Sequence, residues 1–88
     1  MHAPVTTAMT AAVTALDLIE RGDWAGAHEA AQSDDGKDAA WVHAHLHRVE
    51  GDIDNARYWY AQAGRPVDDG PLDVERAAIA EALRAKPA

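Results

Sequence analysis

Three side chains in the middle of the chain have the types and the spacing of metal ligands. His43, His47 and Glu50 lie in the segment WVHAHLHRVE, and residues three or four apart share one face of a helix. Imidazole and carboxylate groups are ligands that zinc and other divalent transition-metal ions take in proteins. The pattern His-x3-His-x2-Glu therefore predicts a site for a divalent metal such as zinc. His45 points away from that site, because it is two residues from each of the other histidines.

A purely structural role is the alternative for the same histidines. An internal repeat, described below, aligns His47 with Leu18, which is a packing position. His43 then borders the core beside Val42 and Leu46. A packed histidine that donates a hydrogen bond to a carbonyl oxygen or to Glu50 needs no metal, so the spacing alone leaves both interpretations open.

Side chains that could act as nucleophiles are scarce. The chain has no Cys, its one Ser is Ser33 in a turn sequence, and its Thr residues all lie near the N-terminus. Covalent and acid–base catalysis both need a base positioned beside a nucleophile or an activated water. The six Gly are scattered at helix ends and form no phosphate-binding motif. We expect no catalytic residues, and the composition favours a protein that is not an enzyme.

A second group of side chains could bind a protein partner. Trp41, His45 and Arg48 follow the side of the same predicted helix that lies opposite its apolar stripe. An aromatic ring beside an arginine that can hold a carboxylate with two hydrogen bonds is typical of protein interfaces. Tyr58, on the next helix, points toward solvent or a partner. We expect these four residues to bind a protein or peptide; in the alternative, Trp41 packs on a neighbouring helix and Arg48 pairs with an acid.

The charge balance excludes several classes of partner. The 88 residues carry a net charge of −7 and no stripe of Lys or Arg, so neither nucleic acid nor an anionic membrane surface is an expected partner. No apolar stretch is long enough to span a bilayer, and the N-terminus lacks the basic residues of an export signal. These features predict a cytoplasmic protein. The acids of the last helix are expected on solvated faces.

Apolar residues at helical spacing, separated by capping residues, predict five helices. They are expected at about 6–21, 24–32, 37–50, 53–63 and 72–85. Gly22-Asp23 and Gly51-Asp52 each end one helix and cap the next. No segment alternates with the period of two that strands require. The sequence therefore predicts one all-α domain over residues 1–88, with a hairpin at 6–33, a hairpin at 37–64 and a terminal helix at 72–85.

The two hairpins are copies of one unit. Gly22-Asp23 recurs 29 residues later as Gly51-Asp52, and Ala27 recurs as Ala56. The second copy resembles a tetratricopeptide repeat, on small, glycine and aromatic residues that stand in register: Ala44, Gly51, Ala56, Tyr60 and Ala63. The spacing of 29 is shorter than the family's period of about 34. The resemblance implies two tetratricopeptide-like hairpins with the last helix as the cap that such stacks require.

The segment 41–66 also resembles a family of small bacterial proteins of uncharacterised function, which implies a helical fold and no particular activity. Alanine makes up half of the apolar residues, so helices are expected to approach closely around a thin core. A homodimer would bury more surface. The expected function is therefore a small helical-repeat protein that mediates protein–protein interaction, without a cofactor. The alternative is a protein that binds a divalent metal through His43, His47 and Glu50.

Overall fold

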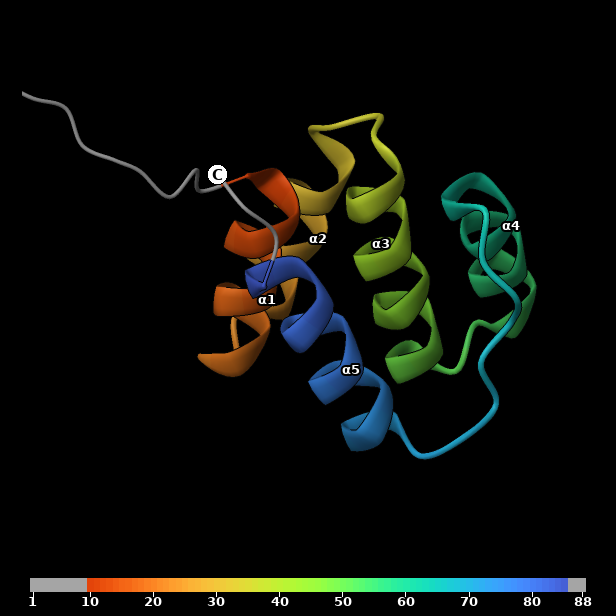
Figure 1. The fold of residues 1–88 in the computed structure, drawn as a ribbon. Helices are drawn as coiled ribbons and strands as arrows, with labels where there is room; N and C mark the ends of the chain where they lie inside the picture. The colour runs from red at the N-terminus through yellow and green to blue at the C-terminus, as the bar shows by residue number, and fades with distance from the viewer. Residues whose placement is uncertain (1–9, 86–88) are drawn as a thin grey trace, which may run out of the picture.

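Five helices and no strand make up the part of the chain that the structure, a computed structural model, describes, which is residues 10–85 (Figure 1). The helices are α1 (Ala11–Glu20), α2 (Trp24–Gln32), α3 (Lys37–Glu50), α4 (Ile53–Ala63) and α5 (Leu72–Arg84). The prediction of an all-α fold is confirmed. Within the same residues, no helix combines the length and the apolar character that crossing a membrane requires.

The first helix begins later than predicted. Thr10 has an extended backbone, and its side-chain oxygen accepts a hydrogen bond from the backbone N–H of Val13 at 3.2 Å. A threonine in this position caps a helix N-terminus, so α1 starts at Ala11. The start predicted at Thr6 or Thr7 lies outside the described residues.

The two Gly-Asp pairs form the turns that the repeat predicts. Gly22 and Gly51 have φ values of 83° and 81°, a left-handed conformation that glycine adopts without strain. Asp23 and Asp52 then cap α2 and α4 by accepting hydrogen bonds from backbone N–H groups three residues later. Each pair therefore reverses the chain in very few residues, and each hairpin brings two helices together.

The central helix of the molecule is α3, with α2 on one side and α4 on the other, and α5 also packs against it (Figure 1). All side chains from Ala39 to Leu46 on α3 are buried. The small side chains of Ala40 and Ala44 let neighbouring backbones approach closely. The two groups of residues singled out in the sequence both lie on α3, so the packing around this helix decides what each can do.

The last helix is attached to the rest through apolar and charged contacts. Ile79 and Leu83 enter the core with 0% and 6% exposure. At the other end, the guanidinium of Arg84 donates to Asp17 at 2.6 Å and to Glu20 at 3.1 Å, both on α1. Arg84 is also in the last turn of α5, where a cation interacts favourably with the helix dipole. These contacts hold α5 against α1 and α3.

Candidate functional site

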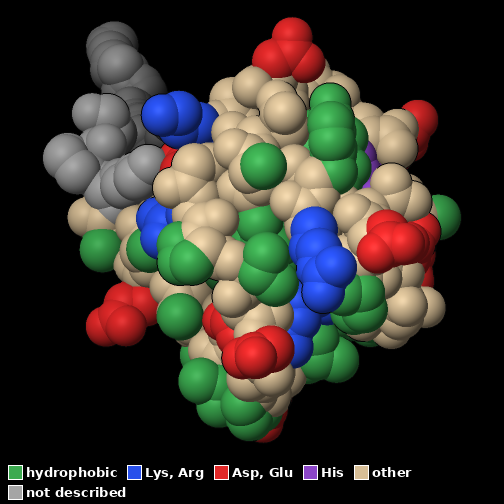
Figure 2. All heavy atoms as spheres, turned by 90° about the vertical axis from the view of Figure 1, so that its right-hand side faces the viewer, with side chains coloured by type: hydrophobic (Ala, Val, Ile, Leu, Met, Phe, Trp, Pro, Cys, Tyr) green, Lys and Arg blue, Asp and Glu red, His purple; other side chains and the backbone are tan. Residues whose placement is uncertain are grey.

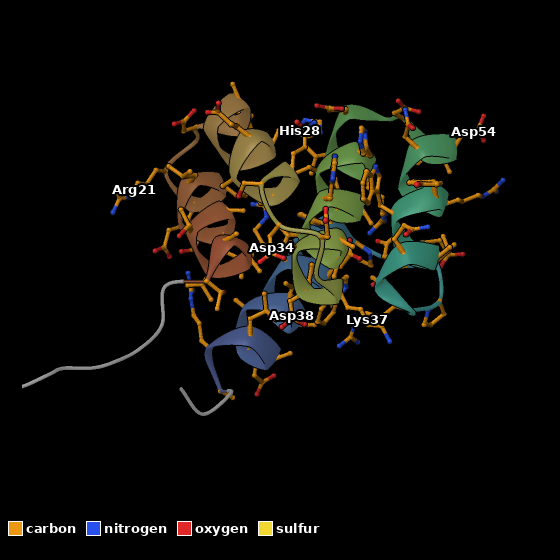
Figure 3. The ribbon with its side chains drawn as sticks, turned by 90° about the horizontal axis from the view of Figure 1, so that it is seen from above. Arg21, His28, Asp34, Lys37, Asp38 and Asp54 are labelled. Carbon is orange, nitrogen blue, oxygen red and sulfur yellow. The ribbon has the colours of Figure 1, made fainter. Side chains whose placement is uncertain are left out.

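Three histidine rings from two helices meet between α2 and α3. His28 comes from α2, while His43 and His47 are one turn apart on α3. The Nε2 atoms of His28 and His43 are 2.7 Å apart, and one ring nitrogen from each histidine can be chosen so that all three lie within 4.8 Å of one another. Figure 3 shows His28 between the two helices. We call this group the three-histidine cluster.

Close packing of α2 on α3 brings the cluster together. Ala27 and Ala31 on α2 are 0% and 1% exposed, and their small side chains allow the helix to lie near α3. His28 is the next residue after Ala27, and its side chain lies at the edge of the interface between α2 and α3, against His43. Its side chain is 23% exposed, against 11% for His47. On the face that Figure 2 shows, histidine appears only as a narrow strip.

An aromatic ring from the second hairpin covers the inner side of the cluster. Trp59 on α4 stacks on His43, with ring centroids 3.9 Å apart and an interplanar angle of 20°. Burial, followed by the proximity of His28 and His47, lowers the pKa of His43 to about 4. His43 is therefore neutral at pH 7. Neutral imidazole is the form that binds a metal ion, so no proton has to leave this ring before binding.

The low pKa of His43 predicts a loss of stability in mild acid. The unfolded chain takes up a proton on this residue below about pH 6.5, whereas the folded protein does so only below about pH 4. The unfolded state thus binds more protons between these values, so the free energy of unfolding should fall by on the order of 3 kcal/mol as the pH drops from 7 to 4. Urea unfolding at a series of pH values measures this. In His43→Gln, the free energy of unfolding should depend less steeply on pH between 7 and 4. An unchanged pH dependence in that variant would contradict the assignment to His43.

Two acids lie at the outer edge of the cluster. The Oε1 atom of Glu50 is 3.3 Å from Nδ1 of His47, and its Oε2 atom is 3.7 Å from Nδ1 of His28. Asp52 Oδ2 is 3.9 Å from the same His47 nitrogen. Within residues 10–85, the Nδ1 atoms of His43 and His47 are buried without a hydrogen-bond partner. An unsatisfied buried polar atom is costly, and the acids beside the cluster, Glu50 and Asp52, lie next to the Nδ1 atom of His47.

The predicted metal ligands are thus brought together, and one more histidine joins them. His43 and His47 share a face of α3, as their spacing indicates, and Glu50 is beside them. His28 was missed because its contact with His43 depends on how two separate helices pack. The only sign of it in the sequence is its place next to Ala27, on the buried edge of a short amphipathic helix.

The face expected to bind a partner is covered by α5. His45 is fully buried, Trp41 is 7% exposed, and the Arg48 side chain is 9% exposed. Both His45 Nδ1 and Arg48 Nη1 lie 2.7 Å from Oε1 of Glu75 on α5. The expectation that these three side chains are exposed is wrong, because Glu75 of the last helix pairs with His45 and Arg48 and the guanidinium of Arg65 lies over the ring of Trp41. Tyr58, in contrast, is 55% exposed.

Glu75 is the centre of this second network. It is 1% exposed, although the sequence placed the acids of this helix on solvated faces. Besides His45 and Arg48, it accepts a hydrogen bond from the hydroxyl of Tyr60 on α4. A buried carboxylate is tolerated when its partners satisfy it in this way, so Glu75 joins three helices.

A shallow pocket of about 270 Å³ remains next to Trp41. The guanidinium of Arg65 lies over the Trp41 ring, 3.4 Å from its centroid, and residues 65–69 form one wall. The arginine therefore occupies the aromatic surface that a partner would contact.

Comparison of the chain with protein-family models, with curated proteins and with solved structures gave no match.

Proposed function

We propose that the protein binds a divalent transition-metal ion of the zinc class through His28, His43 and His47. The observation that carries this proposal is the convergence of three imidazole rings from two helices, with ring nitrogens within 4.8 Å. Zinc bound by histidine has Zn–N distances of about 2.0–2.1 Å, which places the nitrogens of two ligands roughly 3.3 Å apart. The imidazole rings would have to rotate from their present positions to reach that geometry.

The ligand types favour transition metals over other ions. Imidazole suits zinc, copper, nickel and iron, whereas magnesium and calcium require oxygen ligands. The buried position of His43 and the stacking of Trp59 hold one ligand in place before an ion binds. In the competing explanation, the histidines only pack. Packing alone requires no ion, so a metal titration separates the two explanations.

Direct titration of the chelator-treated protein tests the proposal. We expect one zinc or cobalt ion to bind per chain by calorimetry. Nickel or copper should quench part of the tryptophan fluorescence, because Trp59 touches the ligand His43. Magnesium and calcium are the controls and should have no effect. The proposal fails if zinc, cobalt, nickel and manganese produce neither binding heat nor a change in thermal stability.

A role in protein–protein interaction, including formation of a homodimer, stays a proposal. The residues that support it are exposed ones and no longer include Trp41, His45 and Arg48. Tyr58 is exposed, and so are Trp24 and Ile53, at 42% and 45%. The last two occupy equivalent positions of the repeat, directly after Asp23 and Asp52. Exposed large apolar side chains are typical of surfaces that contact partners. A cytoplasmic location also stays a prediction.

A further inference from the structure

The two nitrogens of each histidine ring face different groups. In His28, Nε2 is 2.7 Å from Nε2 of His43, while Nδ1 faces the Glu50 carboxylate at 3.7 Å. In His47, Nδ1 faces the same carboxylate at 3.3 Å. The two nitrogens of an imidazole point to opposite edges of the ring. A metal ion on this cluster would therefore use Nε2 of His28 and of His47, with Glu50 on the far side of both rings.

One carboxylate thus serves two histidines from different helices. Its Oε1 atom is next to His47 on α3 and its Oε2 atom is next to His28 on α2. Metal-bound histidines commonly donate the N–H of their other nitrogen to a carboxylate, which fixes the ring orientation and strengthens the ligand. A small rotation of either ring completes such hydrogen bonds. To become a ligand itself, the Glu50 carboxylate would have to leave both Nδ1 atoms.

The cluster itself offers three ligands, and the acids beside it face the Nδ1 atoms of His28 and His47. Among residues 10–85, the three histidines are the one group of three or more His, Cys, Asp or Glu side chains close enough to hold an ion. Trp59 covers the His43 side. The opposite side reaches solvent, since the side chains of His28 and Glu50 are 23% and 52% exposed. Water therefore has access to the cluster.

We infer that the three-histidine cluster leaves one metal coordination position open, for water or a small anion, and that Glu50 positions His28 and His47 instead of binding the metal. This inference rests on the proposed function. Sites with three protein ligands and one exchangeable position polarise the water bound there. A site closed by Glu50 as the fourth ligand would hold its ion without binding a further ligand.

Cobalt-loaded protein, with azide as the probe, distinguishes the two arrangements. We expect azide to change the visible absorption of the wild type and of Glu50→Gln alike. Glu50→Gln should bind cobalt about 10 to 100-fold more weakly, which is the usual effect of losing such a carboxylate. Glu29→Gln, an exposed change beside His28, is the control and should behave as the wild type.

The failures of the two proposals look different. If azide leaves the wild-type spectrum unchanged but alters that of Glu50→Gln, then Glu50 is the fourth ligand, and the inference is overturned while metal binding stands. Equal cobalt affinity in Glu50→Gln and wild type would overturn the positioning role. If the wild type binds neither cobalt nor zinc, nickel or manganese, the proposed function itself is wrong.

Discussion

Zinc is expected to raise the melting temperature of the wild-type protein and to leave that of His28→Ala unchanged. An ion that binds only the folded state adds about 2.7 kcal/mol of stability when its concentration is about 100 times the dissociation constant. For a domain of this size, that gain corresponds to a shift of roughly 10 °C or more. His28 is the one cluster residue on α2, so its removal takes away both a ligand and the metal link between the hairpins.

His28 is the most suitable cluster residue to replace in this experiment, because the substitution His28→Ala should not unfold the protein. Its side chain is 23% exposed, whereas His43 is 2% exposed and its substitution disturbs the core. Differential scanning calorimetry with and without zinc gives the shift. Glu29→Ala, at an exposed position of the same helix, controls for a change of surface. An equal zinc-dependent shift in His28→Ala and wild type would show that the ion binds elsewhere.

Most of the helix boundaries could be predicted because they depend on neighbouring residues in the sequence. The bounds of α2, α3 and α4 match those expected. A glycine in a left-handed conformation followed by an aspartate cap marks the turn in each hairpin, and both features are local. The start of α1 was placed too early because Pro4, Thr6, Thr7 and Thr10 are all acceptable at a helix N-terminus, and the sequence does not rank them.

The contacts between helices could be predicted only in part. Spacing on α3 places His43 and His47 on one side and His45 on another, and the structure agrees: the first two meet α2, while His45 meets α5. Which helix lies on each side depends on tertiary packing. His28 and Glu75 are therefore the two residues that the sequence could not assign, since their partners lie 15 to 30 residues away in the sequence.

Glu75 also explains why an apparently suitable binding face is unavailable. Trp41, His45 and Arg48 have the chemistry of a site that grips a carboxylate. His45 and Arg48 do bind a carboxylate, and it belongs to the same chain. An acid on a helix that otherwise exposes its charged residues looks solvated in the sequence. Only the pairing of α5 with α3 reveals it as an internal ligand.

Replacing Glu75 is therefore expected to have the largest effect of any change in α5. Burial raises the pKa of Glu75, but hydrogen bonds from His45, Tyr60 and Arg48 outweigh it and leave the pKa below its usual value. The carboxylate is thus ionised at pH 7. Its contribution to stability is present above the pKa of the unfolded chain and is lost as the pH falls through the lower folded value. Removing one member of a buried ion pair typically costs about 3–5 kcal/mol.

For Glu75→Ala, we expect a loss of that size in the free energy of unfolding, measured with urea. Domains of this kind have only about 5–15 kcal/mol in total, so the variant should be close to unfolding at 37 °C. Glu75→Gln keeps the shape of the side chain and tests the charge alone. It should lose less stability than Glu75→Ala but more than about 1 kcal/mol, which is the typical contribution of one hydrogen bond. Glu81→Gln, an exposed change on the same helix, should be neutral. If Glu75→Ala were as stable as the wild type, Arg48 and His45 would have to find solvent or another acid, and α5 would not be held by this carboxylate.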